Sequence, residues 1–179
     1  YEKDIRKAVS GVDCFFDAFG GVCVTAEYIA NKSLDALLEE KKWWDKIGLS
    51  VIVSFIEEIN HFPGLTLCDA VPVYYERSMD YYKDVLSKMG HLGLKRALFT
   101  TQAPIEANYS EQQIYNKMKE SFKILSEYAG QRQLKILLTN TRFRIAADVK
   151  QQKQMLQQIG VSANMGLAVN LNHLSEQEY

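Results

Sequence analysis

One local pattern recurs along this chain: an amphipathic helical stretch, a glycine, and then a short apolar run. A glycine just past a helix accepts the left-handed backbone conformation that ends the helix. The gaps between successive glycines are 37, 45, 37 and 30 residues, which is the size of one βα unit. Units that alternate in this way predict a parallel sheet covered by helices. The glycines are Gly11, Gly48, Gly93, Gly130 and Gly160.

The apolar runs have the form of buried parallel strands, because each is short and stops abruptly at polar residues. Serines before the helical stretches are expected N-caps, and the third of them begins a capping box. These serines are Ser33, Ser78 and Ser110. The predicted strands lie near residues 12–16, 49–53, 96–100, 134–138 and 166–171.

The connections that follow the predicted strands are long, whereas the turns from helix to strand are short. Long loops after strands are where α/β barrels carry their sites. We expect the connection over residues 57–77, which is rich in charged side chains, to be a substrate loop; an ordinary surface excursion is the alternative. The long connections span residues 17–32, 57–77, 100–109 and 139–147.

Composition excludes several classes of protein. The net charge is −1, so the chain has no general electrostatic attraction to nucleic acid or to an anionic membrane. No apolar run approaches the roughly 20 residues that a membrane-spanning helix needs. The three cysteines form no CxxC pattern, which argues against a zinc site or a disulfide framework and predicts a reducing, cytoplasmic location.

Together these features predict a single α/β domain over residues 1–179, built as a TIM-barrel-like partial barrel of about five βα units. The alternative is a doubly wound flavodoxin-like sheet, for which five strands are complete. Sequential strand order favours the barrel, and a reversal of order favours the doubly wound sheet. An open barrel has two unpaired edges, which we expect the long loops or another copy of the chain to cover in a homo-oligomer.

Polar residues follow two of the predicted strands at their carboxyl ends, where α/β proteins assemble their sites. Amide and hydroxyl groups there could hydrogen-bond the hydroxyl groups of a small ligand, and two arginines in the following loop could clamp a phosphate. The amides could instead cap their own loops, and the arginines could be solvated. The candidate substrate-binding residues are Thr139, Asn140, Arg142, Arg144 and Asn170, and the candidate catalytic residue is His173.

Four segments carry a likeness to a known family. Residues 6–13 are similar to its helix–Gly–strand entry, and residues 88–97 are similar to its A-x-x-L-G-x-x-x-V unit. Residues 137–140 stand where it has Leu-x-Glu-Asn, and residues 169–173 where it has x-Asp-x-x-His. On these segments the chain resembles the xylose-isomerase-like TIM barrels, which include sugar isomerases, epimerases and AP endonucleases. That family has eight strands, so the resemblance implies a fragment of a longer barrel.

The resemblance also implies a divalent-metal site, with ligands at the positions of Thr139 and Asn170. The family has a Glu and an Asp there, and the metal polarises substrate oxygens. Both residues are neutral in this chain, although His173 matches. Because hard divalent cations prefer oxygen anions, we expect no bound metal and no other cofactor.

Two hypotheses on function follow from the resemblance. In the first, the chain is a sugar or sugar-phosphate isomerase or epimerase of carbohydrate metabolism that acts at the C-terminal rim of the strands. In the second, it is a catalytically degenerate barrel that binds a ligand or a partner. A small-molecule sugar or sugar phosphate is the expected partner in the first case.

Overall fold

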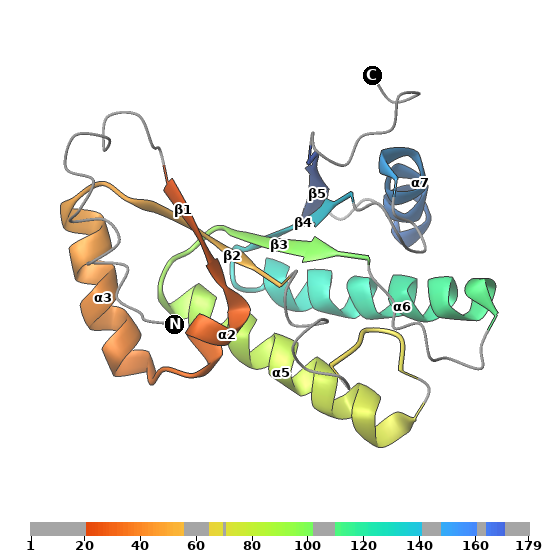
Figure 1. The fold of residues 1–179 in the computed structure, drawn as a ribbon, viewed down its shortest axis with the longest axis horizontal. Coiled ribbons are helices and arrows are strands. Elements are labelled where there is room, and N and C mark those ends of the chain that lie inside the picture. The colour runs from red at the N-terminus through yellow and green to blue at the C-terminus, as the bar shows by residue number, and fades with distance from the viewer. Residues whose placement is uncertain are drawn as a thin grey trace.

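A computed structural model describes residues 21–55, 65–69, 71–101, 110–140, 148–160 and 164–170. Its helices and strands alternate, and the helices lie against the sheet (Figure 1). The strands are β1 (Gly21–Thr25), β2 (Ser50–Ser54), β3 (Arg96–Thr100), β4 (Lys135–Thr139) and β5 (Met165–Ala168). The helices are α2 (Ala26–Ala30), α3 (Leu34–Lys46), α5 (Pro72–His91), α6 (Glu111–Gly130) and α7 (Val149–Ile159).

The described strands form one sheet in the order β1-β2-β3-β4-β5. Every neighbouring pair is parallel. This sequential order confirms the expected partial TIM-barrel-like architecture. It excludes the doubly wound alternative for this sheet, because that fold requires the strand order to reverse. Within the described residues, no helix is both long and apolar enough to cross a membrane.

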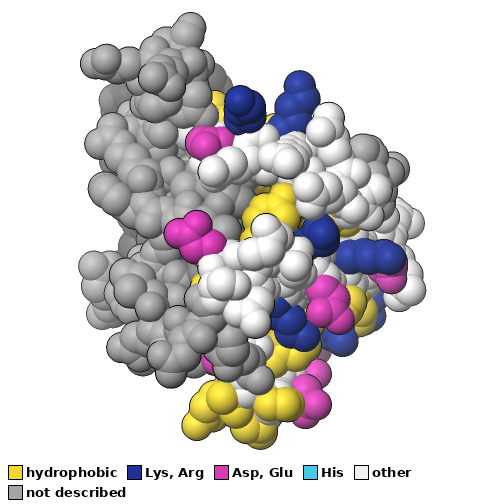
Figure 2. All heavy atoms as spheres, turned by 90° about the vertical axis from the view of Figure 1, so that its right-hand side faces the viewer, with side chains coloured by type: hydrophobic (Ala, Val, Ile, Leu, Met, Phe, Trp, Pro, Cys, Tyr) yellow, Lys and Arg dark blue, Asp and Glu magenta, His cyan; other side chains and the backbone are white. Residues whose placement is uncertain are grey.

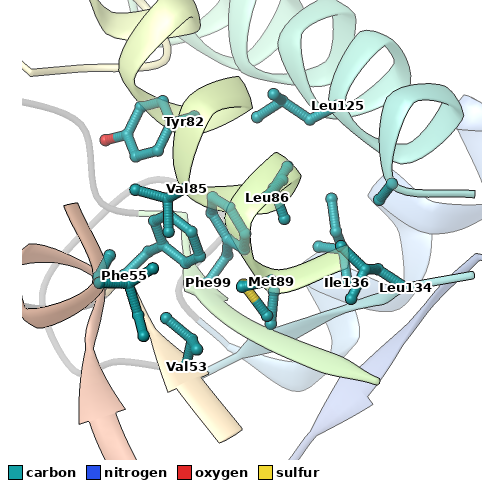
Figure 3. Packing of buried hydrophobic residues seen from close by; sticks show 14 of the residues in the cluster. Val53, Phe55, Tyr82, Val85, Leu86, Met89, Phe99, Leu125, Leu134 and Ile136 are labelled. Carbon is teal, nitrogen blue, oxygen red and sulfur yellow. The ribbon is translucent and has the colours of Figure 1, made fainter. Parts of the chain in front are cut away.

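The core lies between the sheet and helices α5 and α6, and aromatic rings form its centre (Figure 3). Phe55 and Phe99 stack with their ring centroids 4.1 Å apart. Tyr82 of α5 and Phe122 of α6 contact the same Phe99 ring at 5.8 and 5.9 Å. Alternate residues of each central strand point into this layer, so the intervening residues lie on the opposite face of the sheet.

Side chains cap four of the described helices, α2, α3, α6 and α7, and the caps of α3 and α6 are the predicted ones. The Ser33 hydroxyl accepts a hydrogen bond from the Ala36 backbone at the start of α3. Ser110 and Gln113 complete the predicted capping box of α6. Asp148 accepts from the Gln151 backbone at 2.6 Å and so caps α7. Each cap pairs a backbone donor of the first turn that has no partner within the helix.

The predicted start of α5 is wrong. The helix begins at Pro72, six residues before the expected cap, and Ser78 is buried inside it. The Ser78 hydroxyl donates to the Tyr74 carbonyl at 2.8 Å and accepts from the Thr66 backbone at 3.1 Å. Proline is well suited to a first helical position, because its missing N–H needs no partner there. The expected 57–77 loop therefore contains the first turns of α5.

The first described strand lies in a segment that we expected to be a connection. Residues 21–25 form β1 and residues 26–30 form α2, so the expected long connection over residues 17–32 is wrong over residues 21–30. Val22, Val24 and Thr25 favour a strand, but the run begins at a glycine and follows another apolar run at residues 12–16. The predicted strand at residues 12–16 lies outside the described residues.

The glycines that follow the helices serve two purposes. Gly48, Gly93 and Gly160 have the positive φ that ends a helix at low steric cost, as predicted. Gly130 differs, because it is the last residue of α6 and Gln133 has the positive φ instead. A Cβ at Gly130 would lie 2.0 Å from Nδ2 of Asn164, so Gly130 permits close packing of α6 against the segment that enters β5.

This packing predicts a coupled pair of substitutions. Gly130→Ala should destabilise the fold by about 1–3 kcal/mol, as overpacking typically does, because the Asn164 amide must move. In an Asn164→Ala background the same change should be neutral or stabilising, because alanine is the better helix former. Urea denaturation of the four proteins of this double-mutant cycle measures the coupling. Equal effects of Gly130→Ala in both backgrounds would contradict the proposed contact.

Candidate functional site

The candidate site lies at the carboxyl ends of the parallel strands, at the rim of the sheet. Thr100, Thr139 and Ala168 are aligned across β3, β4 and β5 by the strand register. Thr100 is 2% exposed and Thr139 is 4% exposed. These small side chains lie on the face opposite the helices, so the rim presents hydroxyl and methyl groups toward the interior of the partial barrel.

Two asparagines join the ends of β4 and β5. The Asn170 backbone N–H donates to Oδ1 of Asn140 at 2.6 Å, and Nδ2 of Asn140 donates to the Asn170 carbonyl at 3.1 Å. The Asn140 side chain thereby continues the hydrogen-bond ladder beyond the last paired residues of the two strands. Asn140 is 1% exposed. Its amide thus bridges two strands that are 30 residues apart, which differs from the expected alternative of capping its own loop.

Gln152, on α7, forms a hydrogen bond to the carboxyl end of β4. Its Nε2 donates to the Thr139 carbonyl at 2.7 Å, and the residue is 1% exposed. We did not predict this role for Gln152. The available signal is its helical spacing from Met155 and Ile159, which places it on the apolar face of α7 despite its polar side chain.

The structure therefore brings together three of the six predicted site residues: Thr139, Asn140 and Asn170. Arg142, Arg144 and His173 lie outside the described residues, so their positions at the rim stay predictions.

The described part of the rim does not fit a hard divalent cation. Thr139 offers a hydroxyl, and the Asn140 amide already bonds to the backbone of Asn170. Hard cations are held chiefly by carboxylates. Among the described residues, no three His, Cys, Asp or Glu side chains cluster as a metal site would require.

A hollow lies outside the sheet, between the first turns of α5 and α6. Its volume is about 360 Å³, and Cys68, Tyr75 and Lys117 are among the residues that line it. Burial raises the pKa of the Cys68 thiol. A thiol whose pKa is raised in this way stays protonated at neutral pH and is a poor nucleophile. Cys68 is therefore not an activated nucleophile in this hollow.

The face at which α5 and α6 begin also carries exposed apolar side chains (Figure 2). Val71, Val73 and Tyr74, at the start of α5, are 46%, 62% and 51% exposed. They lie beside this hollow, because Pro72 and Tyr75 of the same turn line it. This apolar group is separate from the amide pair at the ends of β4 and β5.

Comparison with known proteins identifies the fold. No protein-family model matches the chain, and no curated protein matches it in sequence. Among solved structures, a D-psicose 3-epimerase from Clostridium cellulolyticum H10 matches with a TM-score of 0.84 at 14% identity, over 100% of this chain and 63% of the other. The 3-keto-D-glucoside 4-epimerase YcjR from E. coli matches with a TM-score of 0.73 at 13% identity, over 99% and 67%.

A xylose isomerase domain protein from Planctomyces limnophilus also matches, with a TM-score of 0.67 at 11% identity, over 90% of this chain and 58% of the other. The chain has the fold of the xylose-isomerase-like TIM barrels, which confirms the predicted resemblance. It spans about three fifths of the length of the D-psicose 3-epimerase structures that it matches.

Proposed function

We propose that this chain binds a sugar or sugar phosphate at the C-terminal rim of its strands and acts as an isomerase or epimerase. The observation that carries the proposal is the meeting of Thr139, Asn140 and Asn170 at the ends of β4 and β5. In parallel α/β folds this is the end of the sheet at which sites assemble. The likeness in fold to sugar epimerases supports the same class of ligand.

The rim residues suit polyhydroxylated ligands. The Thr139 hydroxyl can both donate and accept a hydrogen bond, as a sugar hydroxyl does. Arg142 and Arg144 supply planar donors for a phosphate if they lie where the sequence predicts. Epimerisation beside a carbonyl requires a base that removes a proton from carbon and an acid that returns it. His173 is the proposed base, because a neutral imidazole can accept a proton near pH 7.

Exchange of carbon-bound hydrogen in D₂O tests this activity without knowledge of the product. The wild-type protein should exchange the hydrogen next to the carbonyl of a ketohexose such as D-fructose or D-tagatose, observed as loss of the proton NMR signal. His173→Asn should lower the exchange rate by about 10²–10⁴-fold, because general acid–base groups contribute rate factors of that size. Saturation-transfer NMR on the same samples measures binding separately.

The control is Lys123→Gln on the exposed face of α6, which should leave exchange and binding unchanged. Undiminished exchange in His173→Asn would remove His173 from the mechanism. Neither exchange nor binding with any member of a panel of ketoses and ketose phosphates would contradict the proposed function.

A non-catalytic binding protein is the second candidate. The neutral side chains at Thr139 and Asn170, and the use of the Asn140 amide to join two strands, favour this candidate. It predicts ketose binding without any hydrogen exchange in wild type, so the same experiment separates the two candidates.

A further inference from the structure

Two cationic residues stand side by side on neighbouring strands, and their side chains leave the sheet on the face opposite the helices. Arg96 on β3 and Lys135 on β4 are register partners, and both are exposed. The residues that follow them, Ala97 and Ile136, are fully buried on the helix side. Because side chains alternate along a strand, Arg96 and Lys135 must point to the opposite face. Adjacent parallel strands are about 4.8 Å apart, so the two side chains start close together.

The glycine in β5 shows where the Lys135 side chain lies. A Cβ at Gly166 would be 3.0 Å from Cε of Lys135 and 3.5 Å from its Nζ. It would also be 3.2 Å from Cδ2 of Leu137, which confirms that Lys135 and Leu137 share this face. The ammonium group therefore extends over β5, at the level of the register partners Leu137 and Gly166. It fits there because Gly166 has no side chain.

No counter-charge for this pair is present among the described residues. The ion pairs of the described helices, such as Lys32 with Glu40 and Lys88 with Asp84, include neither Arg96 nor Lys135. Like charges that stand directly opposite each other across two strands destabilise the sheet. An anion that both side chains bind would reduce that repulsion and gain hydrogen bonds to charged donors.

The distance of these cations from the rim indicates that a ligand bound at both places has a neutral polar part and an anionic end. Leu137 and Gly166 are two residues below the rim row of Thr139 and Ala168. At about 3.3 Å per residue, the Lys135 ammonium lies roughly 7 Å below that row. Leu98 and Leu137, which lie above the two cations on the same face, are only partly buried. The interior face of the described sheet thus leads from neutral polar groups at the rim to positive charge below.

We propose that Arg96 and Lys135 form an anion-binding site on the interior face of the sheet, which takes the phosphate or carboxylate of an anionic sugar held at the rim, in place of the pair Arg142 and Arg144. This proposal rests on the proposed function for the sugar, but the anion site is testable by itself. It adds two residues to the site and directs the charged end of the ligand into the partial barrel, toward Gly166.

Inorganic phosphate is the first probe, titrated by calorimetry against the full chain at low and at high ionic strength. Wild type should bind phosphate, and binding should weaken as salt screens the charges. Lys135→Gln and Arg96→Gln should each weaken binding by about fivefold to tenfold, because each removes a charged donor. Lys123→Gln removes one positive charge from an exposed site on α6 and should leave binding unchanged.

Gly166→Ala is a second variant that keeps every charge. Its Cβ would occupy the space beside Cε of Lys135 and displace the ammonium group, so phosphate binding should again weaken. Thermal unfolding of each variant shows whether it is folded. If Lys135→Gln fails to fold, Arg96→Gln and Gly166→Ala decide the result.

Three ligands then relate this site to the rim: D-fructose, D-fructose 6-phosphate and D-gluconate. Either anionic ligand binding more tightly than D-fructose, with the difference lost in Lys135→Gln, supports the proposal and identifies phosphate or carboxylate as the group. Phosphate binding without any sugar binding would keep the anion site and overturn the proposed function. The anion site would be overturned if wild type does not bind phosphate. It would also be overturned if Lys135→Gln, Arg96→Gln and Gly166→Ala all bind phosphate as wild type does. In either case, D-fructose binding still tests the proposed function at the rim.

Discussion

The double substitution Thr139→Glu, Asn170→Asp should raise the affinity of the rim for Mn²⁺ or Zn²⁺ by roughly 10³-fold or more. Each change places a full negative charge at a position where the xylose-isomerase-like family has a metal ligand. Attraction between a carboxylate and a divalent cation at a partly buried site is worth about 2 kcal/mol or more per carboxylate. Two such contributions correspond to about three powers of ten in affinity. Calorimetric titration of parent and variant measures the gain.

The matched control is Thr139→Gln, which has the size of glutamate without its charge and should bind metal as weakly as the parent. Metal should also raise the melting temperature of the double variant, because a ligand that binds only the folded state stabilises it. Tight binding by the parent would show that the ligands are misplaced. No gain in the double variant would mean that the remaining ligands are absent, and metal chemistry should then be dropped for this chain.

Phe99→Ala should lower the free energy of unfolding by about 3–5 kcal/mol, the usual cost of removing a buried aromatic ring from a core. Phe99 is 1% exposed and contacts three other aromatic rings, from Phe55, Tyr82 and Phe122. Figure 3 shows it with Phe55 and Tyr82. The substitution leaves a cavity where the sheet meets both α5 and α6, and rigid neighbours on three sides limit its collapse. Urea denaturation followed by circular dichroism measures the loss.

Tyr74→Ala is the control, because it also removes an aromatic ring but from a residue that is 51% exposed. Its effect should stay within about 0.5 kcal/mol, as is usual for surface substitutions. A loss below about 1 kcal/mol in Phe99→Ala would contradict the assignment of this cluster as the centre of the core.

Local signals were sufficient for much of the fold. The capping box at Ser110 and the glycine turns at Gly48, Gly93 and Gly160 depend on residues only a few positions apart, and all of them are confirmed. The apolar runs predicted four of the five described strands to within one to three residues at either end. β1 was missed because the apolar run at residues 12–16 was taken as the strand of this unit, and residues 21–25 were assigned to the connection after it.

The candidate site, like the fold, could be predicted from the sequence only in part. The sequence predicted that Thr139, Asn140 and Asn170 would meet, because parallel strands bring their carboxyl ends to one edge of a sheet. It could not predict how their polar groups are used. The Asn140 amide pairs with a backbone 30 residues away, and Gln152 bonds to the Thr139 carbonyl from a helix.

The sequence by itself determined the alternation of helices and strands, the parallel sheet and the end of the sheet that carries the polar residues. Those properties follow from periodicity and from backbone preferences, which act over a few residues. Only the tertiary structure decided that Lys135 lies across Gly166 and that Gly130 meets Asn164. Such contacts depend on strand register and on the direction of each side chain in the folded chain, and neither is encoded within one segment.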